Sequence, residues 1–220
     1  QVALKITRTD ELEMLATAKR EYEILVEVQH PRIVLALDFF VFLGGSVLVL
    51  EYIADSFTLQ DGVSAAPGGV LRESTARGLT SCLLQAVAHV HQRGVLHRDV
   101  KAENALVIGD RTAGELHDLR LIDFNTAQRI ADSGCFTLTG TPDYLPPEVL
   151  LGNSHTELSD VWATGVCLHY MVAGTLPWER TDYDSHRDFG LAIGRRDGGS
   201  RALGGALRTG SQCPQTCHCY

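Results

Sequence analysis

The most informative stretch of the 220-residue sequence is an octapeptide rich in charged and amide side chains, His97-Arg98-Asp99-Val100-Lys101-Ala102-Glu103-Asn104. It lies between a segment of helical periodicity and a short apolar run, which places it in a loop. An Asp, a Lys two residues later and an Asn five residues later can converge on one small volume of such a loop. Together they can take a proton from a hydroxyl group, neutralise a moving phosphoryl group and hold a metal ion. A further acidic position, Asp123, follows Asn104 by 19 residues at the end of another apolar run.

The sequence around this loop predicts strands and one helix first, then mostly helices. Apolar residues recur at a helical period before His30-Pro31, which ends that helix because the residue before proline avoids the helical region. Gly44-Gly45 separates two apolar runs, as in a hairpin. We expect strands at 2–7, 33–42, 46–53, 105–108 and 119–122, helices at 10–28, 73–93 and 159–172, and loop at 56–71. This order is an α+β pattern in two lobes.

Composition argues against several classes of protein. An apolar fraction of 45% and a charged fraction of 21% are typical of a globular chain. The net charge of −8 argues against an electrostatic nucleic-acid binder. No apolar run approaches the ~20 residues of a membrane span. The chain has only three lysines, Lys5, Lys19 and Lys101, so the position of each is informative.

The six cysteines do not form the framework of a secreted domain. Cys82 and Cys167 fall in apolar periodic segments, and we expect both to be small buried hydrophobes. Metal binding by Cys213, Cys217, His218 and Cys219 is an alternative, but their spacing differs from the usual CxxC pairs. Because no signal peptide is visible, we expect a cytoplasmic location, with the nucleus as the alternative.

Several segments of the sequence resemble, in the same order, the motifs of a eukaryotic-type serine/threonine protein kinase. The resemblance starts at the third strand of that domain. The 97–104 loop resembles the catalytic loop, and Asp123-Phe124-Asn125 resembles the metal-binding Asp-Phe-Gly. The other matching segments are Val2-Ala3-Leu4-Lys5, Glu21 ahead of His30-Pro31, the run from Gly140 to Pro146-Pro147-Glu148, and Asp160-Val161-Trp162. The resemblance spans residues 2 to about 179 and implies a two-lobed fold, with a partial small β lobe and a mainly helical large lobe.

The resemblance also implies a role for each matching polar residue. Lys5 is expected to hold the α- and β-phosphates of ATP and to pair with Glu21. Asp99 is expected to accept the proton of the substrate hydroxyl. Lys101 is typical of the serine/threonine class and is expected to stabilise the transferred phosphoryl group. Asn104 and Asp123 are the expected Mg²⁺ ligands, since hard oxygen donors suit that ion.

An adenine pocket is implied around the segment that joins the lobes. Leu50 takes the gatekeeper position, and backbone groups of Glu51 and Ile53 are expected to face the base. Leu106 is expected to form the floor of the pocket, although it also fits a simple strand core. Glu103 completes the residues expected beside the nucleotide.

Regulation by phosphorylation is implied at the segment from 123 to 148. In the family, Arg98 answers activation-loop phosphorylation with a charge-assisted pair. Thr137 is the best acceptor because it lies four residues before Thr141, while Thr139 competes and a solvated loop threonine is the alternative. An upstream activating kinase would be a partner. Asp160 is expected to hold the backbone of the 97–104 loop from beneath.

The sequence departs from the family pattern in four respects. The glycine-rich loop would precede Val2, and Asn125 replaces the glycine after Asp-Phe, at a position where Asn tolerates a left-handed backbone. Ala102 and Pro146 replace a common proline and alanine. After residue 179 we expect no further amphipathic helix, so Glu148 lacks the arginine that normally pairs with it. The predicted divisions are a partial N-terminal lobe (1–53), a partial C-terminal lobe (54–179) and a disordered tail (180–220).

The function implied is ATP- and Mg²⁺-dependent phosphorylation of serine or threonine in protein substrates, carried by a fragmentary domain. The rival is a catalytically inactive, pseudokinase-like module that binds nucleotide or a protein partner. Asn125, the missing glycine loop and the tail after residue 179 favour that rival, whereas the intact charged positions oppose it. A small-molecule phosphotransferase shares the Asp, Asn and Asp pattern but does not explain Pro146-Pro147-Glu148. We expect neither a nucleic-acid partner nor a membrane span.

Overall fold

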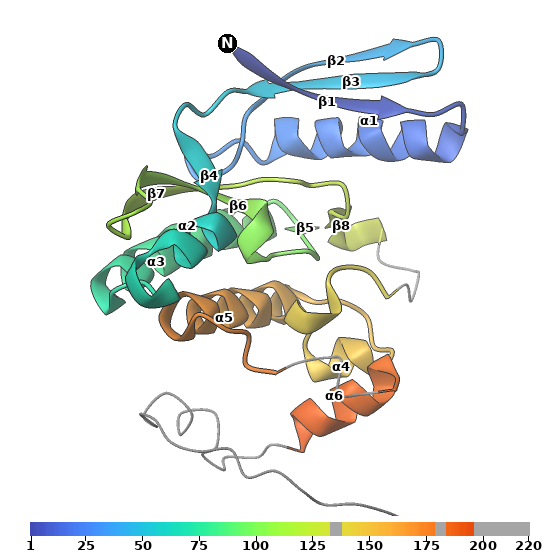
Figure 1. Ribbon diagram of the computed structural model, residues 1–220. Coiled ribbons are helices and arrows are strands. Elements are labelled where there is room, and N and C mark those ends of the chain that lie inside the picture. The colour runs from blue at the N-terminus through green and yellow to red at the C-terminus, as the bar shows by residue number, and fades with distance from the viewer. Residues whose placement is uncertain (133–137, 179–183, 196–220) are drawn as a thin grey trace, which may run out of the picture.

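A computed structural model describes residues 1–132, 138–178 and 184–195 of the chain. The described residues form two parts, one above the other (Figure 1). The upper part is a three-stranded antiparallel sheet with one helix, and the lower part is mainly helical. The predicted α+β, two-lobed architecture is therefore confirmed.

The upper part contains the expected strand, helix and hairpin. Its sheet has the strand order β1-β3-β2, and both pairs are antiparallel. Gly44 adopts a φ of 87° at the hairpin turn, and a Cβ on Gly45 would lie 2.2 Å from the carbonyl oxygen of Thr7. Only glycine fits there without a shift of the backbone. The elements are β1 (Val2–Arg8), α1 (Leu12–Glu27), β2 (Ala36–Phe42) and β3 (Gly45–Glu51).

Strand alternation decides which side chains of β1 face helix α1. Along β1, Leu4 and Ile6 are exposed, whereas Ala3 and Lys5 are half-buried. Successive side chains of a strand point to opposite faces, so Lys5 is directed away from the exposed apolar face. Helix α1 buries Glu21 together with its apolar residues. The upper part thus turns a lysine and a buried glutamate toward each other.

The lower part is built around two long helices that contact each other, α3 (Glu73–Gln92) and α5 (Glu157–Ala173). Gly94, with φ 68°, follows α3, and Gly174, with φ 73°, ends α5, as expected for glycine beyond a helix end. The two expected strands form β6 and β7, and they pair in a sheet of order β4-β6-β7 whose third strand, β4 (Ser56–Thr58), was not expected. The elements between α3 and α4 are β5 (Val95–Leu96), η2 (Ala102–Asn104), β6 (Ala105–Asp110), β7 (Glu115–Leu121), β8 (Gln128–Arg129), η3 (Ile130–Asp132) and η4 (Pro142–Tyr144), and α4 covers Pro147–Leu150.

One apolar cluster runs through both parts. It takes Ile24 from α1, Leu79 from α3 and Cys167 from α5, all at most 1% exposed. Cys82 and Cys167 are buried free thiols, as expected. The continuous core fixes the upper sheet and α1 relative to the lower helices, which sets the geometry of the site between them.

The expected loop at 56–71 is wrong, because this segment contains a strand and two helical elements. The side chain of Thr58 accepts a hydrogen bond from the N–H of Asp61 at 3.0 Å and caps a helix. Leu59 and Val63, one helical turn apart, are buried. Two apolar residues are too few to show a helical period in the sequence, and the nearby glycines and proline favour a loop. The elements are β4 (Ser56–Thr58), α2 (Leu59–Ala65) and η1 (Pro67–Gly69).

The expectation of no helix after residue 179 is also wrong, since α6 (His186–Gly194) forms there. Ser185 caps it by accepting from the N–H of Asp188 at 3.1 Å. Phe189 and Ile193 are buried in a second apolar cluster that includes residues of α4 (Pro147–Leu150). Two glycines in this short segment made its helical period hard to recognise in the sequence. The predicted tail outside 184–195, with its three terminal cysteines, lies outside the described residues.

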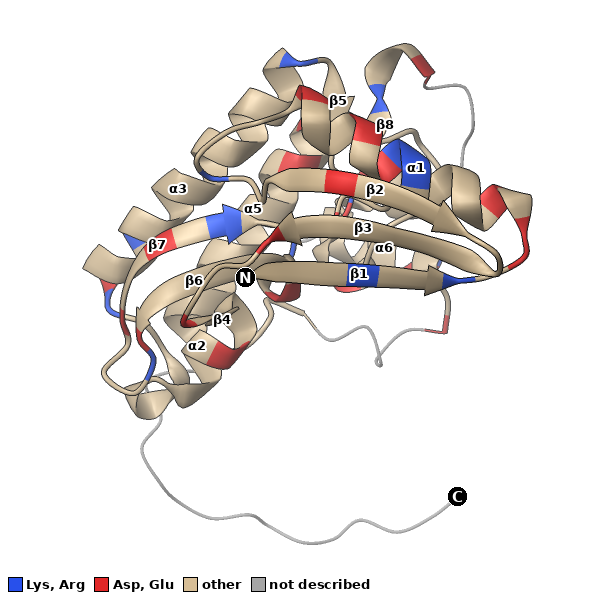
Figure 2. Cartoon of the chain, turned by 90° about the horizontal axis from the view of Figure 1, so that it is seen from above, with Lys and Arg blue, Asp and Glu red and all other residues tan. Residues whose placement is uncertain are grey.

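Figure 2 views the molecule from above and shows β1, β3 and β2 side by side. Acidic and basic positions are interspersed over the elements visible in this view. Within the described part of the chain, no helix has both the length and the apolar character needed to cross a bilayer.

Candidate active site

Three charged side chains from distant segments meet beneath the upper sheet. The Nζ of Lys5 lies 2.8 and 2.9 Å from the two carboxylate oxygens of Glu21 and 2.6 Å from Oδ1 of Asp123. Burial alone would lower the pKa of Lys5, but the two carboxylates outweigh it and hold the pKa above its ordinary value. Lys5 is therefore a fixed cation, aimed by Glu21 at the position of Asp123.

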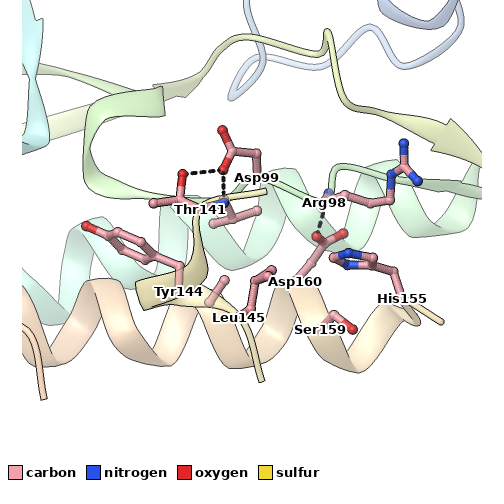
Figure 3. A pocket seen from close by; sticks show the side chains of 10 residues that line it. Arg98, Asp99, Thr141, Tyr144, Leu145, His155, Ser159 and Asp160 are labelled. Carbon is pink, nitrogen blue, oxygen red and sulfur yellow. Dashed lines mark hydrogen bonds between the residues drawn. The ribbon is translucent and has the colours of Figure 1, made fainter. Parts of the chain in front are cut away.

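A second cluster is formed by the 97–104 loop and Thr141. Oδ1 of Asp99 accepts hydrogen bonds from the backbone N–H (2.9 Å) and the hydroxyl (2.8 Å) of Thr141. Its Oδ2 lies 2.8 Å from Nζ of Lys101, which also donates to the Thr141 hydroxyl at 2.7 Å. Nδ2 of Asn104 donates to Oδ2 of Asp99 at 3.0 Å and to the Asp99 carbonyl at 2.9 Å. The four expected residues thus share one hydrogen-bond network, part of which Figure 3 shows.

The carboxylate of Asp99 is ionised at neutral pH. Burial alone would raise its pKa, but the hydrogen bonds from Lys101 and Thr141 and the charge of Lys101 hold the pKa below its usual value. An ionised carboxylate held by donors on both oxygens is oriented before any substrate arrives.

Asp160, at the start of α5, supports the loop from beneath as the sequence predicts. Its two oxygens accept the backbone N–H groups of His97 and Arg98, each at 2.9 Å, and Nε2 of His91 lies 2.8 Å away. Burial would raise the pKa of Asp160, but these hydrogen bonds and nearby charges hold the pKa below its ordinary value. Arg98 has a φ of 67°, and Asp160 keeps its backbone in that left-handed conformation.

His97 ties the loop to the segment that follows β7 and carries Asp123. Its Nε2 lies 3.1 Å from the carbonyl oxygen of Ile122, and its ring meets the fully buried ring of Phe124 edge-on at 4.6 Å. Burial lowers the pKa of His97, so its ring is neutral. Asp123 itself has a φ of 62°. Packing of His97 and Phe124 therefore fixes Asp123 relative to the loop.

A cavity of about 310 Å³ lies next to Lys5. Its lining includes the apolar side chains of Leu50 and Leu106 and polar residues from both clusters. The side chain of Glu51, also at this cavity, accepts the N–H of Leu35 at 2.8 Å. The described residues that line the cavity do not include Ile53, Lys101 or Glu103. Glu103 instead accepts a long hydrogen bond of 3.5 Å from the hydroxyl of Tyr144.

The oxygen atoms available at the cavity suit a hard metal cation such as Mg²⁺. Asn104 and Asp123 both line the cavity, and the amide nitrogen of Asn104 is used as a donor, which leaves its carbonyl oxygen for a cation. One or two protein oxygens plus phosphate oxygens are what Mg²⁺ needs, and no larger acidic cluster is required. Among the described residues, no group of three or more His, Cys, Asp or Glu could hold a metal ion.

Three expectations concern the segment after Asp123. Thr137 lies outside the described residues. Asn125 is exposed and is not among the described residues with positive φ, so the expected need for a left-handed backbone does not arise. Glu148, expected to need an arginine partner, is only half-buried. Its partial exposure reduces the cost of a charge at this position.

Two residues beside the loop escaped the sequence analysis. Gln128 accepts a hydrogen bond from Nη1 of Arg98 at 2.5 Å. His155 lies with Ser159 and Asp160 at a cavity of about 10 Å³, close to the volume that holds one water (Figure 3). Burial, followed by the charge of Arg98, lowers the pKa of His155. Both residues stand outside long periodic segments, so the sequence carries no signal for them.

Comparison with known proteins identifies relatives over most of the chain. A family model described as "Protein kinase domain" matches residues 1–193. The chain is 32% identical over 171 residues to Aurora/IPL1-related protein kinase 2 of Caenorhabditis briggsae, which covers 73% of this chain and 50% of that protein. It is 35% identical over 188 residues to CBL-interacting protein kinase 24 of Oryza sativa subsp. japonica, covering 82% of this chain and 39% of that protein.

A third relative is CBL-interacting serine/threonine-protein kinase 13 of Arabidopsis thaliana, 34% identical over 183 residues, which covers 81% of this chain and 35% of that protein. The chain thus spans between about a third and a half of the length of these relatives.

Proposed function

The chain belongs to the protein kinase family, and from this premise we propose that it transfers the γ-phosphoryl group of ATP to serine or threonine in protein substrates. The observation that carries the proposal is the juxtaposition of two charged clusters. Lys5, Glu21 and Asp123 form one, and Asp99 and Lys101 lie in the other. Phosphoryl transfer needs positioning and charge neutralisation more than covalent help from the protein, and these clusters supply both.

Nucleotide binding would use the cavity and the Lys5 cluster. Lys5, held by Glu21, would bind the α- and β-phosphates, and Asn104 and Asp123 would hold Mg²⁺. The ion, when bound, neutralises charge on the transferred group. Leu50 and Leu106 would pack on the adenine, with backbone groups of Glu51 and Ile53 facing its edge, as in the family.

Transfer itself would use the second cluster. The ionised carboxylate of Asp99 would orient the substrate hydroxyl and accept its proton. The ammonium of Lys101, 2.8 Å from that carboxylate, would stabilise the phosphoryl group as it passes. The network through Thr141 would keep both side chains in this geometry. Lys101 and the names of the serine/threonine relatives support a hydroxyl acceptor on serine or threonine.

We further propose that phosphorylation regulates the activity of the chain. A phosphate placed on Thr137 by an upstream kinase would pair with Arg98, whose guanidinium already donates to the carbonyl of Thr126 at 2.7 Å. An unchanged activity of Thr137→Ala would contradict this part. The expected cytoplasmic or nuclear location stays a prediction.

The test is a thermal melt of the 220-residue chain with and without Mg-ATP. A ligand at a hundredfold its dissociation constant adds about 2.7 kcal/mol to stability, which raises the midpoint by several degrees. We expect Lys5→Met and Asp123→Ala each to abolish the shift, measured against each variant's own ligand-free melt. Lys19→Met is the control, because Lys19 is an exposed lysine of α1 whose one ion pair among the described residues is with Glu23, at 3.7 Å.

Transfer to a peptide separates the kinase from a nucleotide-binding module. The chain should label a serine or threonine peptide with phosphate from ATP, and Asp99→Asn should lose that labelling while keeping the thermal shift. A cooperative melt with no shift, or a shift without any transfer, would overturn the proposed catalysis.

A further inference from the structure

The two-residue strand β8 connects two parts of the site. It pairs with β5 in antiparallel register, with Leu96 opposite Gln128 and Val95 opposite Arg129. Neighbouring side chains of a strand point in opposite directions. Arg129 reaches Glu27 at the end of α1, with distances of 2.6 and 3.2 Å. Gln128 points the other way, toward the 97–104 loop.

Gln128 uses both ends of its amide. Its Oε1 accepts from Nη1 of Arg98 at 2.5 Å, and its Nε2 donates to the carbonyl of Asp132 at 2.8 Å. Nε of Arg98 also donates to the carbonyl of Thr126 at 2.7 Å. The amide therefore joins the loop to the far end of η3, and the two bonds orient it unambiguously.

The position of Arg98 bears directly on Asp99, its neighbour in the chain. The backbone of Arg98 is left-handed, and its N–H is held by Asp160 at 2.9 Å. Within the described segments, no carboxylate forms an ion pair with its guanidinium, so Gln128 and Thr126 hold that side chain through neutral oxygens. A side chain released at Arg98 would relax the strained backbone that places the carboxylate of Asp99.

We infer that Gln128 is a positioning residue, which fixes the 97–104 loop through Arg98 and holds residues 128–132 against it. This inference rests on the proposed kinase function for its kinetic consequence. Its structural consequence, the coupling of two segments by one amide, does not depend on catalysis.

Two variants of Gln128 and one control variant test the two hydrogen bonds of the amide. Gln128→Leu keeps the size of the side chain and removes both hydrogen bonds. Gln128→Glu keeps an acceptor for Arg98, now with a negative charge, and loses the donor to Asp132. Gln60→Leu, at an exposed glutamine of α2, is the matched control. All three are compared in the full 220-residue chain after the midpoint of thermal unfolding has confirmed that each folds.

The first measurement is hydrogen exchange of the ligand-free chain. Gln128→Leu should speed exchange in peptides covering 96–99 and 126–132, Gln128→Glu should do so less around 96–99, and Gln60→Leu should leave both unchanged. Equal exchange in Gln128→Leu and the parent chain, or an equal effect of Gln60→Leu, would overturn the inference. The exchange measurement tests the inference even if the chain transfers no phosphate. A lack of phosphate transfer would count against the proposed function but not against the structural role of Gln128.

The second measurement is steady-state kinetics with ATP and a peptide. Loss of a hydrogen bond to a charged group should lower kcat about tenfold to a hundredfold in Gln128→Leu. The KM for ATP should change less than twofold, because Lys5 and the cavity are untouched. Gln128→Glu should restore kcat to within about threefold of the parent. A raised KM with normal kcat, or no rescue by Gln128→Glu, would contradict a positioning role.

Discussion

Single residues of the site are held by compensated charges. Lys5 lies between Glu21, which is 4% exposed, and Asp123, and Asp99 lies against Lys101. Desolvation makes each such charge costly unless its partner is present. The charged groups that would handle ATP and the acceptor hydroxyl are therefore positioned before binding.

Asp160 should be among the residues whose loss costs most stability. Asp160→Asn places an amide where two backbone N–H groups and His91 need acceptors, so we expect the free energy of unfolding to fall by about 2–4 kcal/mol. Denaturant titration measures it, with the exposed Asp10→Asn as control. A loss below about 0.5 kcal/mol would show that the loop does not depend on this carboxylate.

Sequence analysis identified the charged residues of the site but not their neutral supports. Lys5, Asp99 and Asp123 stand in recognisable spacings, and the structure brings each into a charged cluster. Gln128 bonds to Arg98 and His155 lines a cavity beside it, and no local spacing in the sequence indicates such neighbours from distant segments. The direct contact between Lys5 and Asp123 was not foreseen for the same reason.

At the scale of elements, two helical glycines should respond in opposite directions to alanine. A Cβ on Gly190 of α6 would lie 2.8 Å from Cβ of Leu150, whereas one on Gly78 of α3 would meet nothing within 4 Å. We expect Gly78→Ala to stabilise the chain by about 0.5–1 kcal/mol. Gly190→Ala should destabilise it by about 1–2 kcal/mol, because overpacking exceeds the gain in helix propensity.

Thermal melts of the two glycine variants measure this contrast, since each serves as the control for the other. A stabilising Gly190→Ala would mean that α6 does not pack against α4 as closely as the structure shows.

Elements with many periodic residues were predictable, and short ones were not. Helices α3 and α5 have long apolar stripes and glycine ends, so their bounds can be predicted to within a few residues. Helices α2 and α6 are short, contain glycine, and are stabilised by a capping side chain and a few buried contacts. Tertiary packing rather than local propensity decides such segments.

For the whole molecule, stability should decrease as the pH falls below about 6.5. Burial is the main cause that lowers the pKa of His30, His89, His97 and His155 from the ordinary value of 6.5. Near pH 6 the unfolded chain binds protons that the folded chain resists, so the stabilisation is complete above 6.5 and is lost in acid. Each of the four groups adds to the dependence of stability on pH in the same direction, so together they give a measurable slope.

Melting midpoints between pH 5 and 7.5 measure this slope. His89→Phe keeps a ring against His30, which stacks on His89 at 4.7 Å, and should reduce the slope. A midpoint that rises on acidification would contradict the prediction, as would an unchanged slope in the variant.

The scarcity of lysine has a chemical consequence. Of the three lysines, Lys19 has 66% of its side chain exposed and lies 3.7 Å from Glu23, while the ammonium groups of Lys5 and Lys101 each lie 2.8 Å from a carboxylate oxygen. Every other side-chain cation of fixed charge is an arginine, whose guanidinium does not react as a primary amine. Apart from the N-terminal amine, acylating reagents therefore meet one open surface amine and two amines held in the short ion pairs of the site. The extent of acylation of Lys5 and Lys101, relative to that of Lys19, therefore reports whether the two ion pairs are formed.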